Sequence, residues 1–522
     1  MRKRLPIGVQ DFKQLRAKNC VYVDKTELIY RLTTEGWYYF FSRPRRFGKS
    51  LLVSTLKELF TGNRALFEGL WIEDKWDWSE TSPVVHISFA KIDYQGLGLE
   101  NAINKQLDSC AESYDMALEE TTNKGKFEEL LRKLNDKIGK IVFLVDEYDK
   151  PIIDFLEETK LPKAKEHQEI MKSFYSVLKD NEELLHFVLI TGVSKFTKVS
   201  IFSDLNHLDD ITLDKHYALL AGYTHSELEN NFQDYLIAAA KSLNINTQKL
   251  LAEMEKWYDG FSWDGVNKVY NPFGTLNFLK NQAFRNYWFA TGTPTFLAQL
   301  MEQQFRFDFD NIHTTTSRIE KYDLDNLDAV SLLFQTGYLT ITQLNPMNGD
   351  IVSDYPNQEI RESMYVFLLD YIKRRRNHQS AQEVVRDLSA AFQQDDLARV
   401  KDLLESMFGD LPSNLYEGDD KKSERFFHSI IHLTFKYLGI YVESEVRTAK
   451  GRADSVVQTP THVYIFEFKH KETAEVAFQQ IIDKNYAQKY LGLRKTIVGI
   501  GVNFDKEKKT IEGWEVKVLK EA

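Results

Sequence analysis

The stretch from Trp37 to Leu56 constrains the fold of this chain more than any other. An apolar run from Trp37 to Phe41 ends in a short loop, and Gly48-Lys49-Ser50 then opens a helix with apolar periodicity. A strand, a loop and a helix in this order predict a phosphate-binding loop, because backbone N–H groups at the start of the helix point at an anion. Lys49 can reach the β- and γ-phosphates of a nucleotide, and the Ser50 hydroxyl can bind Mg²⁺.

The loop departs from the usual glycine-rich pattern at its first position. Arg43 stands where that pattern has a glycine, and Pro44 follows it. The loop is therefore stiffer and more cationic than usual, and its arginines could contact phosphates. A Gly-Lys-Ser that merely begins a helix is the competing interpretation. The residues predicted to bind the nucleotide in this stretch are Pro44, Arg45, Arg46, Phe47, Gly48, Lys49 and Ser50.

A second motif lies far downstream of this loop. Ile141 to Val145 is a short apolar run rich in β-branched residues, as in a strand buried on both faces, and it ends in Asp146 and Glu147. A carboxylate at the end of such a strand, here Asp146, can hold the Mg²⁺ that accompanies a nucleotide. Glu147 beside it can orient or deprotonate the attacking water. Solvated acids at a strand end are common, but the two motifs together favour nucleotide binding.

Length and composition exclude several classes of protein. A chain of 522 residues is too long for one core and predicts about three or four domains. No apolar run approaches the ~18 residues of a membrane span, so we expect no membrane association. Cys20 and Cys110 are the only cysteines, which argues against a disulfide framework and fits a cytoplasmic protein. The net charge of −10 argues against a general nucleic-acid binder, although a local basic patch could still bind one.

Further strand candidates alternate with helical segments through the first part of the chain. Pro83–Phe89 and Phe187–Gly192 have the pattern of strands, and a long helical stretch is expected from about Leu97 to Leu134. This alternation predicts a parallel sheet wound with helices, in which ligands bind beyond the carboxyl ends of the strands. Thr191 and Ser194 would then lie near the γ-phosphate as sensors of the nucleotide, and ordinary strand-end hydrogen bonding is an equal alternative.

Changes in sequence character divide the chain into four predicted parts. The first, residues 1–225, holds both nucleotide motifs. Residues 226–355 contain helical segments dense in aromatic side chains, and we expect them to form a helical, winged-helix-like lid on the nucleotide site. A helical connector is expected at 356–415 and a further domain at 416–522, with Gly418-Asp419-Asp420 as the best marker of the boundary.

The last domain is also expected to combine helices and strands. The predicted helices are Ser423–Leu438 and Ala474–Tyr490, and the predicted strands are Ile440–Val446, Ala453–Val457, Val463–Phe468, Thr496–Phe504 and Trp514–Leu519. Glu467 and Lys469 are two residues apart, so both leave the same face of one strand, where a core strand would carry Val or Ile. Asp454 on the preceding strand could lie beside Glu467 across the ladder.

Two carboxylates and a lysine at one point would form a site for a divalent metal. Mg²⁺ prefers carboxylate and water oxygens as ligands. Such a metal lowers the pKa of its water and neutralises the charge that develops on a phosphate under attack. An exposed Glu–Lys face on an edge strand is the competing interpretation.

The two groups of motifs together resemble a known family. The chain is similar to the AAA-ATPase-like proteins of bacteria, Bacteroidetes especially, that carry a C-terminal PD-(D/E)XK nuclease-superfamily domain. In the first part the resemblance is carried by Leu5–Gly8, Tyr22–Thr26, Arg43–Ser50, Phe143–Pro151 and Thr191–Phe196. In the last domain it is carried by Gly451–Asp454, Glu467–Lys469 and Gln479–Ile481.

The resemblance implies a P-loop NTPase fold followed by a restriction-endonuclease-like α/β domain, with ATP and Mg²⁺ as cofactors. It implies that Asp454 and Glu467 bind metal and that Lys469 is the catalytic cation. Gln480 would be the accessory residue on the following helix, and Glu424 the acid on the first helix of the domain.

The leading hypothesis is therefore an ATP-regulated nuclease, in which the nucleotide state of the first module gates Mg²⁺-dependent cleavage of nucleic acid, with DNA as the expected substrate. The alternative is a nucleotide-switched protein that grips nucleic acid without cutting it. The missing first glycine motivates this alternative, because a slow ATPase suits a switch. The sequence leaves open the form of the nucleic acid and whether copies of the chain form a homo-oligomer.

Overall fold

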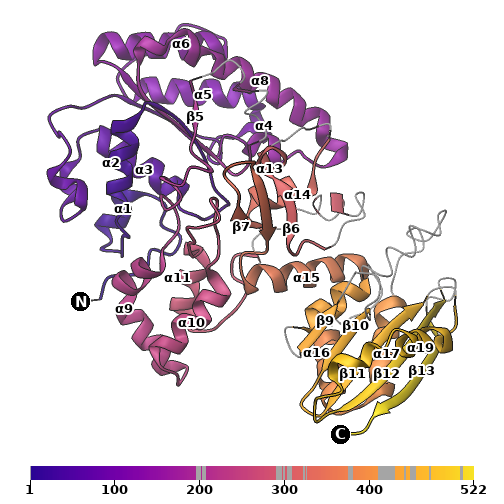
Figure 1. Ribbon diagram of the computed structural model, residues 1–522. Coiled ribbons are helices and arrows are strands. Elements are labelled where there is room, and N and C mark those ends of the chain that lie inside the picture. Colours follow the sequence, from indigo (N-terminus) through magenta and orange to yellow (C-terminus); the bar gives the residue numbers. More distant parts are fainter. Residues whose placement is uncertain are drawn as a thin grey trace. The chain divides into compact units, whose positions relative to one another are not determined.

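The computed structural model describes residues 2–195, 201–202, 207–289, 297, 300–301, 308–320, 324, 326–373, 380–409, 430–439, 443–446, 454–469, 472–505 and 510–522 (Figure 1). The chain divides into two compact units. The first comprises residues 1–297 and 309–360, and the second comprises residues 298–308 and 361–522. The domain limits expected at 225, 355 and 415 stay predictions.

A five-stranded parallel sheet forms the centre of the first unit, with the strand order β2-β3-β4-β1-β5. Its strands are β1 (Tyr38–Ser42), β2 (Val84–Ser88), β3 (Ile141–Asp146), β4 (Leu185–Gly192) and β5 (Asp209–Asp210). Every residue of β1 and β3 is buried, as expected for strands covered on both faces. The predicted α/β sheet is therefore confirmed. Because β4 lies between β1 and β3, it separates the loop after β1 from the acids after β3.

Helices precede and connect these strands, and two of them replace one long helical stretch that was expected. They are α1 (Phe12–Ala17), α2 (Thr26–Glu35), α3 (Lys49–Phe60), α4 (Tyr94–Leu97), α5 (Leu99–Glu112), α6 (Asn123–Lys137), α7 (Lys150–Ile153) and α8 (Leu161–Asp180). The single long helical stretch expected from Leu97 to Leu134 is wrong. The chain leaves the helix after Glu112, and a new helix begins when the Thr122 side chain accepts the Gly125 N–H as an N-cap.

The rest of the first unit mixes helices with a small sheet. The helices are α9 (His225–Ser242), α10 (Thr247–Tyr258), α11 (Pro272–Asn281), α13 (Thr316–Glu320) and α14 (Ala329–Thr336). The strands β6 (Ile312–Thr315), β7 (Thr340–Leu344) and β8 (Asp350–Asp354) form an antiparallel sheet in the order β6-β8-β7. These strands are only four or five residues long, and a turn at Asn345–Gly349 joins β7 to β8.

The second unit places helices around a mixed sheet. Helix α15 (Gln358–Lys373) leads into it, followed by α16 (Ala381–Gln393), α17 (Leu397–Gly409) and a helix at 430–438. The strands β9 (Glu443–Val446), β10 (Ser455–Gln458), β11 (His462–Lys469), β12 (Thr496–Asp505) and β13 (Thr510–Lys520) pair in chain order, and only β11 and β12 run parallel. This sheet and helix α19 (Ala474–Asp483) confirm the α/β expectation.

One predicted helix of the second unit is too long. The helix expected at 474–490 ends at Asp483, and a short 3-10 helix follows at Tyr486–Tyr490. Asn485 between them has a φ of 50°, in the left-handed region that asparagine tolerates better than most residues. The chain therefore turns there, and Tyr486 faces a different direction from the one that a continuous helix would give it.

Candidate functional site

Arg43, which replaces the usual first glycine of the loop, does not face a ligand. Its side chain is fully buried, and Nη1 donates to the carbonyl oxygens of Ser42 and Thr212, each at 2.9 Å. The guanidinium carbon lies 3.9 Å from the centre of the Trp263 ring. Arg43 therefore ties the base of the loop to later parts of the chain by a stacked, hydrogen-bonded contact that no glycine could make.

Of the next four loop side chains, two are buried and two are exposed. Pro44 is buried, and a Cβ added at Gly337 would lie 2.5 Å from its Cγ. Phe47 is buried with its ring centre 4.8 Å from that of Phe261. The side chains of Pro44 and Phe47 thus pack into the protein, so only their backbone could face a nucleotide. Arg45 and Arg46 have exposed side chains, and the Arg46 guanidinium stacks on Phe273.

Lys49 and Gly48 form the centre of the loop. The Lys49 side chain is buried, and its Nζ donates to the carbonyl oxygens of Arg43 at 2.7 Å and Pro44 at 2.9 Å. Burial lowers the pKa of Lys49, and the charges of Glu147 and Asp146 oppose that shift. Gly48 is exposed, and a Cβ added there would meet no atom within 4 Å, so the space beside it is open. This shape and charge fit a phosphate group.

The two acids after β3 are held differently. Asp146 is buried at the end of β3, and the Thr191 hydroxyl donates to its Oδ1 at 3.1 Å. Glu147 adopts a φ of 54°, which is uncommon for a residue with a side chain. Burial raises the pKa of Glu147, although the positive charge of Lys49 opposes this. Thr191 therefore orients Asp146, and Lys49 and Glu147 interact electrostatically in the same site.

Asp149 is a buried acid to which the sequence analysis assigned no role. Its Oδ2 accepts hydrogen bonds from the backbone N–H groups of Val193 and Ser194 and from the Ser194 hydroxyl, at 3.0, 2.6 and 2.7 Å. The Tyr148 hydroxyl donates to the Ser194 carbonyl at 2.8 Å. Burial raises the pKa of Asp149. Tyr148 and Asp149 therefore hold Ser194 in place. The only sequence signal for Asp149 was that it lies at the end of an acid-rich run.

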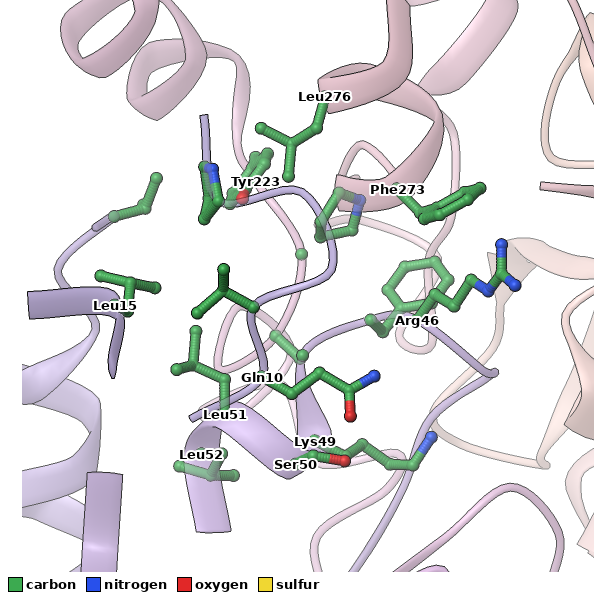
Figure 2. A pocket seen from close by; sticks show the side chains of 18 of the residues that line it. Gln10, Leu15, Arg46, Lys49, Ser50, Leu51, Leu52, Tyr223, Phe273 and Leu276 are labelled. Atoms are coloured by element: carbon green, nitrogen blue, oxygen red, sulfur yellow. The ribbon is translucent and has the colours of Figure 1, made fainter. Parts of the chain in front are cut away.

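A cavity of about 400 Å³ opens beside the loop (Figure 2). Figure 2 shows Lys49 and Ser50 at one side of it, with Tyr223 and Leu276 at the other. Its remaining lining includes Pro6–Gln10, Val21–Val23, Ala221, Gly222, Pro272 and Phe273. Lys25 lies in its wall, where Nζ pairs with Glu227 at 2.6 Å. A polar, cationic end and an apolar remainder suit a ligand that carries phosphates at one end and a flat apolar ring at the other.

Three of the residues predicted in the second unit come together. Glu467 on β11 is buried, and Lys469, two residues later, places Nζ 3.5 Å from its Oε1. Lys469 Nζ also donates to Gln480 Oε1 at 2.7 Å, and Gln480 Nε2 donates to Glu467 Oε1. Because α19 packs on β11 and β12, it carries Gln480 over the strand. The side chains form a closed triangle of hydrogen bonds.

Asp454 lies next to this triangle. Its Oδ2 accepts the backbone N–H of Phe468 at 2.9 Å. Burial raises the pKa of Glu467 to about 7, the charge of Asp454 adds to this, and Lys469 opposes it. Glu467 Oε2 is buried and has no hydrogen-bond partner among the described residues. A buried carboxylate oxygen without a donor, beside a second carboxylate, is the environment in which a hard cation such as Mg²⁺ fits.

A third predicted acid cannot be placed. Glu424 lies outside the described residues, as do Gly451, Arg452 and Ala453. Within the described part of the chain, no group of three or more His, Cys, Asp or Glu residues could hold a metal ion. Of the three acids predicted for this site, Asp454 and Glu467 lie within the described residues.

Comparisons with known proteins identify a family for each of the two domains. The family model described as "Predicted AAA-ATPase" matches residues 6–202, and that of the PD-(D/E)XK nuclease superfamily matches residues 422–514. An uncharacterised protein of the vnfD 5′ region from Azotobacter chroococcum mcd 1 is 36% identical over 529 residues, covering 99% of each chain. The chain belongs to the family of predicted AAA-ATPases with a C-terminal PD-(D/E)XK nuclease-superfamily domain.

A solved structure is also similar to this AAA-ATPase-like protein. It is the ORC1 protein of Aeropyrum pernix in complex with DNA, with 12% identity, 68% of this chain and 90% of that chain covered, and a TM-score of 0.26. A likeness at that level carries no argument about this chain.

Among the described residues, no helix is both long and apolar enough to cross a membrane.

The nuclease-superfamily domain contains one polar residue at its site that the sequence analysis missed. Gln480 Nε2 lies 3.3 Å from the hydroxyl of Tyr486, in hydrogen-bonding geometry. Burial raises the pKa of Tyr486, and the charges of Glu467 and Asp454 add to this effect. Tyr486 was missed because a helix continuing to Tyr490 gives no reason to place it near Glu467.

Proposed function

We propose that this protein binds ATP with Mg²⁺ in its first unit and cleaves phosphodiester bonds of nucleic acid, DNA in particular, in its second. The ATP state would control the cleavage. The observation that carries the nuclease part is the hydrogen-bonded triangle of Glu467, Lys469 and Gln480 beside Asp454. The observation that carries the ATP part is the open, cationic loop around Gly48 and Lys49.

The residues of the first unit have distinct roles in this proposal. The triphosphate would lie against the backbone of Arg45–Ser50, with Lys49 Nζ leaving its carbonyl partners to meet the β- and γ-phosphates. Ser50 and Asp146 would hold Mg²⁺, which neutralises phosphate charge when it is bound. Glu147 would orient the attacking water and take its proton, a role that suits a carboxyl group with a raised pKa. The base and ribose would occupy the apolar part of the cavity.

The residues of the second unit fit phosphodiester hydrolysis. Asp454 and Glu467 would hold Mg²⁺, which lowers the pKa of a bound water when it is present. Lys469 would stabilise the negative charge that develops on the phosphate, because its Nζ is fixed in direction by Gln480. Gln480 would thus act through Lys469 and Glu467 rather than on the substrate.

The proposal is tested with purified full-length protein, supercoiled plasmid DNA and Mg²⁺, with and without ATP. We expect nicking or linearisation that Glu467→Ala lowers by roughly 100-fold or more, as loss of a preorganised charged group at a reaction centre does. Lys49→Ala should weaken ATP binding and remove the effect of ATP on cleavage. Exposed positions on neighbouring helices supply the matched controls Glu475→Gln and Lys57→Ala, which should behave like the wild type.

Two results would contradict the proposal. If Glu467→Ala cleaves DNA as fast as the wild type, the nuclease site does not include Glu467 and lies elsewhere in the protein. Tight binding of nucleic acid without cleavage in any nucleotide state would instead favour a nucleotide-switched binding protein.

A further inference from the structure

One tryptophan far along the chain holds the phosphate-binding loop. The indole Nε1 of Trp288 donates to the backbone carbonyl of Arg45 at 3.0 Å. The indole is buried, with Phe261 and Tyr338 packed against it at ring-centre distances of 6.3 and 5.4 Å. Phe261 also packs against Phe47 of the loop. The position of the Arg45 carbonyl is therefore linked to the position of Trp288.

A buried carboxyl group holds the backbone of the same tryptophan. Glu359 is fully buried, and its Oε1 accepts the backbone N–H of Trp288 at 2.6 Å. Its Oε2 has no hydrogen-bond partner in the described part of the chain. Burial raises the pKa of Glu359 to about 8, and the backbone N–H groups of Trp288, Tyr287 and Phe289 oppose the shift. Burying a carboxyl group without hydrogen-bond partners costs free energy. The backbone N–H groups of residues 287–289 are the donors that offset this cost for Glu359.

Glu359 lies at the start of α15, a helix whose residues are divided between the two units. It is the second residue of α15, whose first three residues belong to the first unit and whose residues from Arg361 onward belong to the second. Asn357 anchors the beginning of α15, because its side chain donates to the Asp259 carbonyl at 2.8 Å and accepts the Ile360 N–H at 3.1 Å. A continuous set of contacts thus runs from the loop through Trp288 to the first turn of α15.

We propose that Trp288 and Glu359 are positioning residues that couple occupancy of the nucleotide site to α15. The inference deepens the proposed function, on which it rests, by naming the route by which ATP controls the second unit. Closure of the loop on phosphates moves the Arg45 carbonyl, Trp288 follows its hydrogen-bond acceptor, and Glu359 passes the shift to the helix. A ligand changes such an equilibrium only through contacts that differ between two states, and in this proposal the Arg45–Trp288 hydrogen bond is that contact.

The test measures hydrogen exchange of peptides covering residues 358–373 in the full-length protein, with and without ATP and Mg²⁺, together with ATP affinity. In the wild type, ATP should change protection in the first turns of α15. Trp288→Phe keeps an aromatic ring but removes the indole N–H, so it should bind ATP within about tenfold of the wild-type affinity, consistent with loss of one hydrogen bond, and lose the change in α15. Trp257→Phe, at a half-buried position on α10, is the matched control and should keep that change.

A pair of variants at Glu359 separates coupling from folding. Glu359→Gln keeps an oxygen that accepts the Trp288 N–H and should retain the response of α15 to ATP, whereas Glu359→Ala should lose it. A response in Trp288→Phe equal to that of the wild type would overturn the inference and leave the proposed function intact. Absence of ATP binding to the wild-type protein would overturn the proposed function and this inference with it.

Discussion

The two candidate sites of this protein are built in opposite ways. In the second unit, the site residues come from elements close together in the chain. Asp454 directly precedes β10, Glu467 and Lys469 lie on β11, Gln480 lies on α19, and Tyr486 begins the 3-10 helix that follows. In the first unit, the loop at residues 43–50 is held by side chains and backbone groups from as far along the chain as Thr212, Trp263, Trp288 and Gly337.

This difference predicts where each site is sensitive to substitution. A site formed by neighbouring elements depends mainly on its own residues, because the strand and helix that carry it pack on one another directly. A site held by distant segments depends on every buried contact that sets the backbone of its loop. Substitutions in each site, and a change of pH, test this difference.

The largest effect is expected at Arg43. Arg43→Gly restores the usual loop pattern but removes a buried guanidinium with three carbonyl acceptors and an aromatic stack, so it should lower the free energy of unfolding by about 3 kcal/mol. The midpoint of thermal unfolding of the first unit measures this. Arg45→Gly, at an exposed side chain of the same loop, is the control and should shift that midpoint little. Equal shifts for the two variants would show that the loop does not depend on its distant contacts.

A smaller effect is expected from the ionisation of Glu359. The folded-state pKa of about 8 lies above the ordinary value of 4.5, so the stability that the neutral form contributes is present below pH 4.5 and lost as pH rises through 8. Between pH 6 and pH 8.5 the wild type should therefore lose about 2 kcal/mol relative to Glu359→Gln, which cannot ionise. Denaturant unfolding of both proteins across this pH range measures the difference. A constant difference would contradict the prediction, and Glu229→Gln, an exposed acid on α9, controls for general charge effects.

The smallest effect is expected at Gln480, within the locally built site. Gln480→Ala frees Lys469 and Glu467 without removing either, so cleavage should fall by roughly tenfold, the lower range for residues that orient catalytic groups. The adjacent Gln479→Ala, which loses only a contact with Asp483 on the exposed face of α19, should cleave like the wild type. Initial rates of plasmid cleavage across Mg²⁺ concentrations measure both. If the cleavage rates of both variants fall equally, lower stability of α19 rather than lost positioning of Lys469 explains the loss.

Much of the candidate sites could be predicted because their signals are local. Alternation of apolar and polar residues along one strand places Glu467 and Lys469 on the same face. The family resemblance implied that the helix after this strand carries Gln480 to them. In the same way, two apolar runs predicted strands that end near Asp146 and Thr191, and the structure shows that these strands are neighbours and joins the two side chains by a hydrogen bond. The roles of these residues in catalysis and binding stay predictions.

Where the expectations failed, the deciding residues were single capping or turn positions. Thr122 begins a new helix within the stretch expected from Leu97 to Leu134, and Asn485 turns the chain before Tyr486. Such positions change the direction of the chain without changing the periodicity around them. Apolar periodicity alone therefore overestimates the length of helices.

The sequence alone predicted the α/β class of both domains, the strand, loop and helix around Lys49, and the shared strand face of Glu467 and Lys469, because periodicity and strand ends are properties of short segments. The place of Gln480 was expected from the family resemblance. The folded structure was needed to show that Arg43 is buried and hydrogen-bonded, that Asp149 holds Ser194, and that Trp288 and Glu359 connect the loop with the start of α15. These contacts join residues far apart in the chain, and packing in three dimensions, which no short pattern encodes, selects their partners.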